Sequence, residues 1–141
     1  MSKYVLADTG FWYALYEPRD AHHSKANLIG ELIENQNIIL PWPSLYETLN
    51  TRFTKRRSRM IQFESYISGP NVHLIDDSEY KLDALNQTFE HSKVGFRTFS
   101  LVDSVIRELL KDENLKIDYL ITFNTGDFID LCVKRKIEIY N

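Results

Sequence analysis

Short and nearly continuous apolar runs recur along the chain, separated by stretches with helical periodicity. The runs do not alternate between apolar and polar residues, so they fit strands buried on both faces of a parallel sheet better than strands with one wet face. They cover residues 4–7, 38–40, 72–75, 119–123 and 137–140, the last being the weakest. The pattern therefore predicts a mainly parallel central sheet of about five strands.

Amphipathic segments lie between these runs, and Gly69-Pro70 and the Pro-Trp-Pro sequence at 41–43 mark an end and a start of helices. Regular alternation of strands and helices predicts an α/β fold with three layers, α/β/α, in which helices cover both faces of the sheet. We expect residues 1–141 to form a single domain. The expected helices span 10–18, 21–35, 43–57, 59–67, 78–91, 101–113 and 126–134.

The amino-acid composition says more about the cellular compartment of the protein than about its activity. With 43% hydrophobic and 26% charged residues and a net charge of −3, the chain is an ordinary globular protein whose bulk charge does not indicate a polyanion partner. The single cysteine, Cys132, excludes an internal disulfide and is expected to be buried. We see no apolar stretch long enough for a signal peptide or a membrane span, and expect a cytoplasmic protein with no membrane contact.

Four carboxylates fall near the junctions between predicted strands and helices, and they are Asp8, Glu47, Asp103 and Asp127. In a parallel α/β sheet, strand carboxyl ends and the helix N-termini that follow share one edge, so we expect these four side chains to converge there. Clustered carboxylates raise one another's pKa values unless a cation neutralises them. Oxygen-only donors suit Mg²⁺ or Mn²⁺ rather than zinc.

Each acid taken alone also has a purely structural interpretation. Residues 44–47 and 100–103 match the spacing of a capping box. Thr125 is suited to cap a helix whose positive end favours Asp127, and Asp8 is a common turn residue. Capping does not by itself explain why four such acids share one predicted edge.

Four segments in this order and spacing resemble the acidic motifs of PIN-domain nucleases, most closely the VapC-type ribonucleases of toxin–antitoxin pairs. They read VLADTGFWYAL, PSLYETLN, FSLVDSVI and ITFNTGDF, and residues 20–26 also resemble the family's usual run there. The resemblance covers essentially the whole chain. It departs at Gly10, where the family commonly has a serine, although Thr9 keeps a hydroxyl beside Asp8.

The resemblance implies metal-dependent hydrolysis of RNA, with Mg²⁺ or Mn²⁺ held by carboxylates. Asp8, Glu47 and Asp103 are assigned as the primary metal ligands, and Asp127 completes the catalytic cluster as a ligand or a water-positioning group. The neighbouring donors that can contact the phosphate or orient the ligands are Thr9, Asn124 and Thr125. The resemblance further implies a homodimer and an inhibiting antitoxin protein.

Two other features have both a functional and a structural interpretation. The segment 52–59 holds five cations that can bind the RNA backbone or form a solvated helix end, and they are Arg52, Lys55, Arg56, Arg57 and Arg59. The segment 10–18 holds more aromatic rings than one helix face can bury, which predicts an exposed apolar strip for a partner, with at least two of the rings in the core.

Other functions are consistent with parts of this pattern. A non-catalytic PIN-like module that binds RNA or regulates a partner is the main alternative, and the complete set of four acids argues against it. A phosphatase of haloacid-dehalogenase type needs an aspartate where Gly10 stands. A nucleotide-binding Rossmann domain needs a glycine-rich phosphate loop after the first strand, which this sequence lacks.

Overall fold

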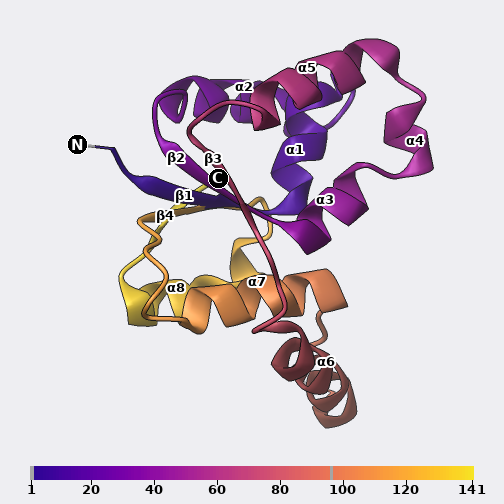
Figure 1. Ribbon diagram of the computed structural model, residues 1–141. Coiled ribbons are helices and arrows are strands. Elements are labelled where there is room, and N and C mark those ends of the chain that lie inside the picture. The colour runs from indigo at the N-terminus through magenta and orange to yellow at the C-terminus, as the bar shows by residue number, and fades with distance from the viewer. Residues whose placement is uncertain (1, 96) are drawn as a thin grey trace.

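The computed structural model describes residues 2–95 and 97–141. At its centre lies a five-stranded sheet in the order β3-β2-β1-β4-β5, and every neighbouring pair is parallel (Figure 1). The predicted α/β fold with a parallel sheet is thereby confirmed. The strands are β1 (Tyr4–Ala7), β2 (Asn37–Pro41), β3 (Val72–Ile75), β4 (Tyr119–Ile121) and β5 (Glu138–Tyr140).

Helices cover both faces of the sheet (Figure 1). On one face lie α1 (Thr9–Tyr16), α2 (His23–Leu32) and α5 (Arg57–Ile67), and on the other α7 (Leu101–Lys111) and α8 (Ile129–Arg135), with α6 (Lys81–Val94) packed against α7. At the carboxyl edge, α3 (Trp42–Thr48) contacts both α1 and α7, and α4 (Thr51–Thr54) follows it. The 3₁₀ helix η1 (Thr125–Asp127) precedes α8. Within the described ranges, no helix is long and apolar enough to cross a membrane.

Strand side chains alternate between two apolar clusters, one on each face. Val5 and Ala7 pack with Trp12 on the side of α1, whereas Leu6 packs with Leu109 on the side of α7. All five side chains are fully buried, which explains why the strands read as continuous apolar runs. Each large side chain of this kind stabilises the fold by roughly 1.5–3 kcal/mol through burial.

The predicted helix over 43–57 is two helices in the structure. Helix α3 ends at Thr48, and α4 starts after Asn50, whose Oδ1 accepts a hydrogen bond from the Phe53 amide at 3.0 Å. Asparagine is among the best N-cap residues because its side chain satisfies a free amide at the helix start. The local cap therefore outweighs the periodicity that favours one long helix.

The aromatic residues of α1 lie mainly in the core. Phe11 and Trp12 are fully buried, while Tyr13 and Tyr16 are half-buried against Phe53. Core packing of at least two rings is confirmed, but the exposed strip predicted in this segment is wrong. Exposed large apolar side chains occur instead on α3 and α6, and they are Trp42, Tyr46, Leu82, Leu85 and Phe89.

Candidate active site

The sheet order places a topological switch point between β1 and β4, where the chain turns to opposite sides of the sheet. Crevices at such points, beyond the strand carboxyl ends, are the usual ligand sites of open α/β sheets. Asp8 follows β1, and its amide donates to the Ile121 carbonyl of β4 at 2.9 Å. Thr122 follows β4, and its hydroxyl donates to Asp8 Oδ2 at 3.1 Å. The two strand ends are thus joined through the Asp8 carboxylate.

Asp8 is only 5% exposed and forms the N-cap of α1, where its Oδ1 accepts a hydrogen bond from the Thr9 amide at 2.7 Å. Burial, and then the nearby charge of Asp103, raise the pKa of the Asp8 carboxyl to about 6. Hydrogen bonds from Thr122 and Thr9 act in the opposite direction, and the charge of Glu47 adds a further increase. The carboxylate is oriented on both oxygens but its charge is poorly compensated.

Asp103 lies in the first turn of α7, and its amide donates to the hydroxyl of the N-cap residue Ser100 at 3.1 Å. Burial raises the pKa of the Asp103 carboxyl, hydrogen bonds from Ser100 lower it, and the charges of Asp127 and Glu47 raise it further. The capping interpretation of residues 100–103 is therefore confirmed, and it does not prevent Asp103 from facing the other acids. Glu47 lies near the end of α3 and is exposed.

Two other predicted caps are wrong. Helix α3 begins at Trp42, so Ser44 lies inside it, is fully buried, and finds no hydrogen-bond partner for its hydroxyl in the described part of the chain. The proline at the second helical position starts the helix earlier than the Ser44 box requires. Thr125 is the first residue of η1, and its hydroxyl accepts from Asn141 Nδ2 at 3.0 Å instead of capping a helix.

Asp127 is paired with a residue that the sequence does not single out. Its Oδ1 accepts hydrogen bonds from Arg97 Nε at 3.0 Å and from Arg97 Nη2 at 2.6 Å. Gly126 allows this approach, because a Cβ there would lie 2.8 Å from Arg97 Nη2. Arg97 therefore compensates the charge of Asp127, whereas no Lys or Arg among residues 2–95 and 97–141 pairs with Asp8.

A second arginine fixes the backbone of the same turn. Arg107 of α7 is 8% exposed, and its Nη1 donates to the Asp127 carbonyl at 2.6 Å. Its guanidinium also makes a bidentate pair with Asp130, at 2.9 and 2.8 Å, and lies 4.6 Å from the centre of the Phe99 ring. The Arg107 hydrogen bonds lower the pKa of Asp130. Arg107 thus anchors η1 to α7 and gives Asp130 a structural partner.

The four acids offer the oxygen donors that a divalent cation prefers, but their side chains are not arranged around one common centre. They offer only carboxylate oxygens, and the Thr9 hydroxyl next to Asp8 is buried without a hydrogen-bond partner in residues 2–95 and 97–141. In those same residues, no three His, Cys, Asp or Glu side chains form a group that could hold a metal ion. Asp127 is instead paired with Arg97.

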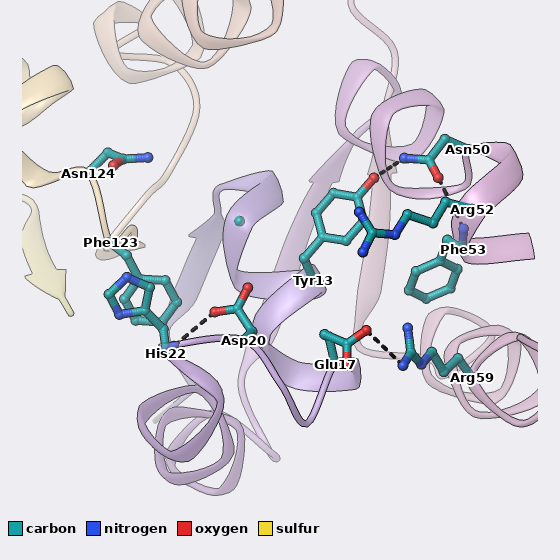
Figure 2. A pocket seen from close by; sticks show the side chains of 11 residues that line it. Tyr13, Glu17, Asp20, His22, Asn50, Arg52, Phe53, Arg59, Phe123 and Asn124 are labelled. Atoms are coloured by element: carbon teal, nitrogen blue, oxygen red, sulfur yellow. Dashed lines mark hydrogen bonds and ion pairs between the residues drawn. The ribbon is translucent and has the colours of Figure 1, made fainter.

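A groove of about 430 Å³ opens beside these acids, between α1, the start of α2, α4 and the segment after β4 (Figure 2). Gly10 and Asn124 line it, placing it next to Asp8 in one segment and Asp127 in the other. The Tyr13 hydroxyl lies in the groove and donates to the Glu47 carbonyl at 2.6 Å. We call this hollow the α1–α4 groove.

The structure divides the basic segment between two surfaces. Arg52 and Arg59 line the α1–α4 groove, and Arg59 Nη2 pairs with Glu17 Oε2 at 2.8 Å. Arg59 also borders a second, shallow hollow beside Tyr16, which is lined by the remaining three cations, Lys55, Arg56 and Arg57. Of the basic run, Arg52 and Arg59 therefore line the α1–α4 groove.

Comparison with known proteins relates the chain to others by structure alone. No protein-family model and no curated protein sequence matches it. The structure of Mycobacterium tuberculosis VapC20, a Sarcin-Ricin loop cleaving toxin, is similar with a TM-score of 0.69 and 18% identity, over 89% of this chain and 94% of that one.

Two further structures show the same likeness. Rickettsia felis VapBC2, bound to a DNA fragment from its promoter, has a TM-score of 0.59 and 15% identity, with 96% of each chain covered. Neisseria gonorrhoeae FitAcB has a TM-score of 0.60 and 14% identity, with 97% of this chain and 96% of that chain covered. The chain therefore has the fold of PIN-domain toxins, and the resemblance indicated by its four acidic motifs is confirmed at the level of the fold.

Proposed function

We propose that the protein is a Mg²⁺- or Mn²⁺-dependent endoribonuclease and the toxin of a toxin–antitoxin pair. The observation that carries this proposal is Asp8, a buried carboxylate whose pKa is raised to about 6 at the switch point of a PIN-like sheet. Structural acids of this kind are normally neutralised by a fixed cation, and perturbed carboxylates in a crevice are typical of functional sites. The likeness to toxin structures supports the same function.

Each residue has a distinct role in this proposal. Asp8, Glu47 and Asp103 would hold the metal ion, which when bound supplies an activated water and neutralises charge on the scissile phosphate. Thr122 orients Asp8 through its hydrogen bond, and Ser100 orients Asp103.

The second part of the cluster follows β4. Asp127 would complete it as a ligand or by positioning water, once its carboxylate is released from Arg97. Thr9, Asn124 and Thr125 are the proposed phosphate-contacting or ligand-orienting groups. Thr9 fits best, because its buried hydroxyl has no hydrogen-bond partner in the described ranges.

The proposed partners are an RNA substrate, a second copy of the chain and a small antitoxin. The likeness to VapBC2 and FitAcB supports the antitoxin. For the homodimer we propose the exposed apolar side chains of α3 and α6 as the contact, since Leu82 is 70% exposed and Tyr46, which lines a hollow of about 450 Å³, is 76% exposed. The buried free thiol of Cys132 suits a reducing compartment, and we place the protein in the cytoplasm.

RNA hydrolysis by the purified protein tests the function. We expect cleavage with Mg²⁺, none with a chelator, and loss of at least about a hundredfold in rate for Asp8→Asn and Asp103→Asn with folding retained. Asp83→Asn is the matched control, because Asp83 occupies in α6 the position that Asp103 occupies in α7 and is exposed. Binding of RNA without any cleavage, unaffected by divalent metal, would establish the non-catalytic module instead.

A further inference from the structure

We propose that the α1–α4 groove binds one unstacked nucleobase of a single-stranded RNA, placed against the paired rings of His22 and Phe123. This inference rests on the proposed ribonuclease function and deepens it, because it names which part of the substrate is recognised and by which residues.

The ring pair is the first observation. His22 precedes α2 and is exposed, while Phe123 follows β4 and is half-buried. Their ring centres lie 4.3 Å apart and their planes differ by only 6°. Figure 2 shows the two rings lying against each other. Asp20 Oδ1 accepts a hydrogen bond from the His22 amide at 2.8 Å and so fixes the start of α2. The exposed His22 ring offers a flat, preformed surface on which a nucleobase can stack.

The second observation is position. Gly10, two residues after Asp8, and Asn124, three residues before Asp127, belong to the same groove as the ring pair. A Cβ at Gly10 would meet nothing within 4 Å, so the passage from groove to acids is open at that point. Phe123 also directly follows Thr122, whose hydroxyl donates to Asp8 Oδ2, so a base on the ring pair would lie beside the proposed metal site.

The third observation is the charge of the walls. Arg52 lines the groove and makes no ion pair within the described residues, so it is free to contact a phosphate next to the bound base. Asp20 presents carboxylate oxygens that can accept hydrogen bonds from base N–H groups. The volume of about 430 Å³ falls within the range of roughly 300–1,000 Å³ typical of small-ligand sites. Cations, an acid and a flat ring pair together fit a nucleotide better than an apolar peptide segment.

Binding measured without catalysis tests the subsite. The full chain is titrated, with a chelator present, against a fluorescent oligouridine of about 12 nucleotides, which is long enough to fill one strand-binding site. We expect His22→Ala to weaken binding about five- to tenfold, at the lower end of the effect of one stacked base. His73→Ala is the matched control, because His73 is also exposed and stacked on an aromatic ring, Tyr4, but sits at the opposite end of β1.

A probe without bases separates stacking from charge. Inorganic polyphosphate should compete equally well for wild type and His22→Ala, whereas Arg52→Ala should weaken binding of both polyphosphate and RNA. If His22→Ala binds RNA as tightly as wild type, or loses RNA and polyphosphate to the same extent, the subsite proposal fails.

Nuclear magnetic resonance on the wild-type chain gives a second measurement that does not depend on a variant. Addition of the oligouridine should move the ring C–H signals of His22 upfield and leave those of His73 and His91 in place. Unmoved His22 signals at saturation would overturn the proposal. Base-dependent binding through His22 without metal-dependent cleavage would refute the ribonuclease and leave the subsite standing. Cleavage with unchanged affinity in His22→Ala would do the reverse.

Discussion

Replacing Asp8 by asparagine should stabilise the metal-free protein while abolishing its proposed activity. The carboxylate is 5% exposed and has a pKa of about 6 in the folded chain, against an ordinary value of 3.8. At neutral pH it is ionised in surroundings that favour its neutral form. Asparagine has nearly the same shape, carries no charge, and is as good an N-cap as aspartate.

The size of the effect follows from the two pKa values. Their difference of about two corresponds to about 3 kcal/mol by which ionisation of Asp8 weakens the folded state well above pH 6. The asparagine amide can accept from the Thr9 amide but cannot accept from Thr122 in the same arrangement, which costs about 1 kcal/mol. The expected net gain for Asp8→Asn in free energy of unfolding is about 1–2 kcal/mol near pH 8.

The gain depends on pH with a definite sign. Because the pKa of Asp8 is raised on folding, the folded chain binds this proton more tightly than the unfolded chain. Wild type therefore loses stability as the pH rises through about 6 and recovers it as the pH falls towards 3.8. The advantage of Asp8→Asn should be full near pH 8 and absent near pH 4, where only the lost hydrogen bond remains.

Urea unfolding followed by far-ultraviolet circular dichroism, in chelator and between about pH 4 and 8, measures this difference. Asp83→Asn serves again as the control, since its acid is exposed and its difference from wild type should stay small at each pH. Mg²⁺ should then stabilise wild type and leave Asp8→Asn unchanged, because the ion binds only the folded acid cluster. A variant less stable than wild type throughout, or a difference independent of pH, would refute the account of Asp8.

Four further substitutions test three more predictions. Arg107→Gln should lower the free energy of unfolding in urea by about 2 kcal/mol, because the buried guanidinium holds η1. Asp130→Asn should lower it by less than about 1 kcal/mol, because the Asp130 side chain is 60% exposed. Equal losses in the two variants would contradict this explanation. Gly10→Ser should raise the unfolding temperature by about 1–2 °C in a thermal melt, since a helical glycine with open space gains from a side chain; a lower temperature would mean a hidden clash. Arg97→Gln should lower the Mg²⁺ concentration at half-maximal binding several-fold in calorimetry, because the substitution removes the cation paired with Asp127. An unchanged concentration would show that Asp127 is not a ligand.

The fold could be predicted from the sequence because its strands and helices have different hydrophobic periodicities. Strand β1 alternates Val5 and Leu6 between two buried faces, so both residues must be apolar, and the run itself identifies a parallel sheet. Helix boundaries were less accessible where a local side chain decides them. Asn50 ends the periodicity of α3, and the proline at the start of α3 moves the helix start ahead of Ser44.

The candidate site could be predicted only in part, because some of its contacts join residues that are far apart in the sequence. Asp8, Glu47, Asp103 and Asp127 could be named because the sequence pattern predicts each near a strand–helix junction, and topology brings such junctions to one edge. In the structure Glu47 lies near the end of α3, and α7 follows another helix, α6. Residues that contact the acids from a distant part of the sequence have no comparable sequence pattern. Thr122 reaches Asp8 over a separation of 114 residues, and no spacing in the sequence links them. A hydroxyl directly after a strand that neighbours β1 is the one signal that could have suggested it.

Asp127 differs from the other acids in how its charge is balanced. Asp8 and Asp103 have raised pKa values, and the charge of Asp103 contributes to the increase at Asp8, so a bound cation lowers the free energy of both. Asp127 already has Arg97, and a cation that binds the same oxygen, Oδ1, would have to displace a guanidinium bound through two nitrogens. Since Arg97 is 50% exposed, breaking this pair costs little. Under the proposed function, Asp8, Glu47 and Asp103 would hold the metal ion, whereas Asp127 would offer Oδ1 to it only once Arg97 has moved away.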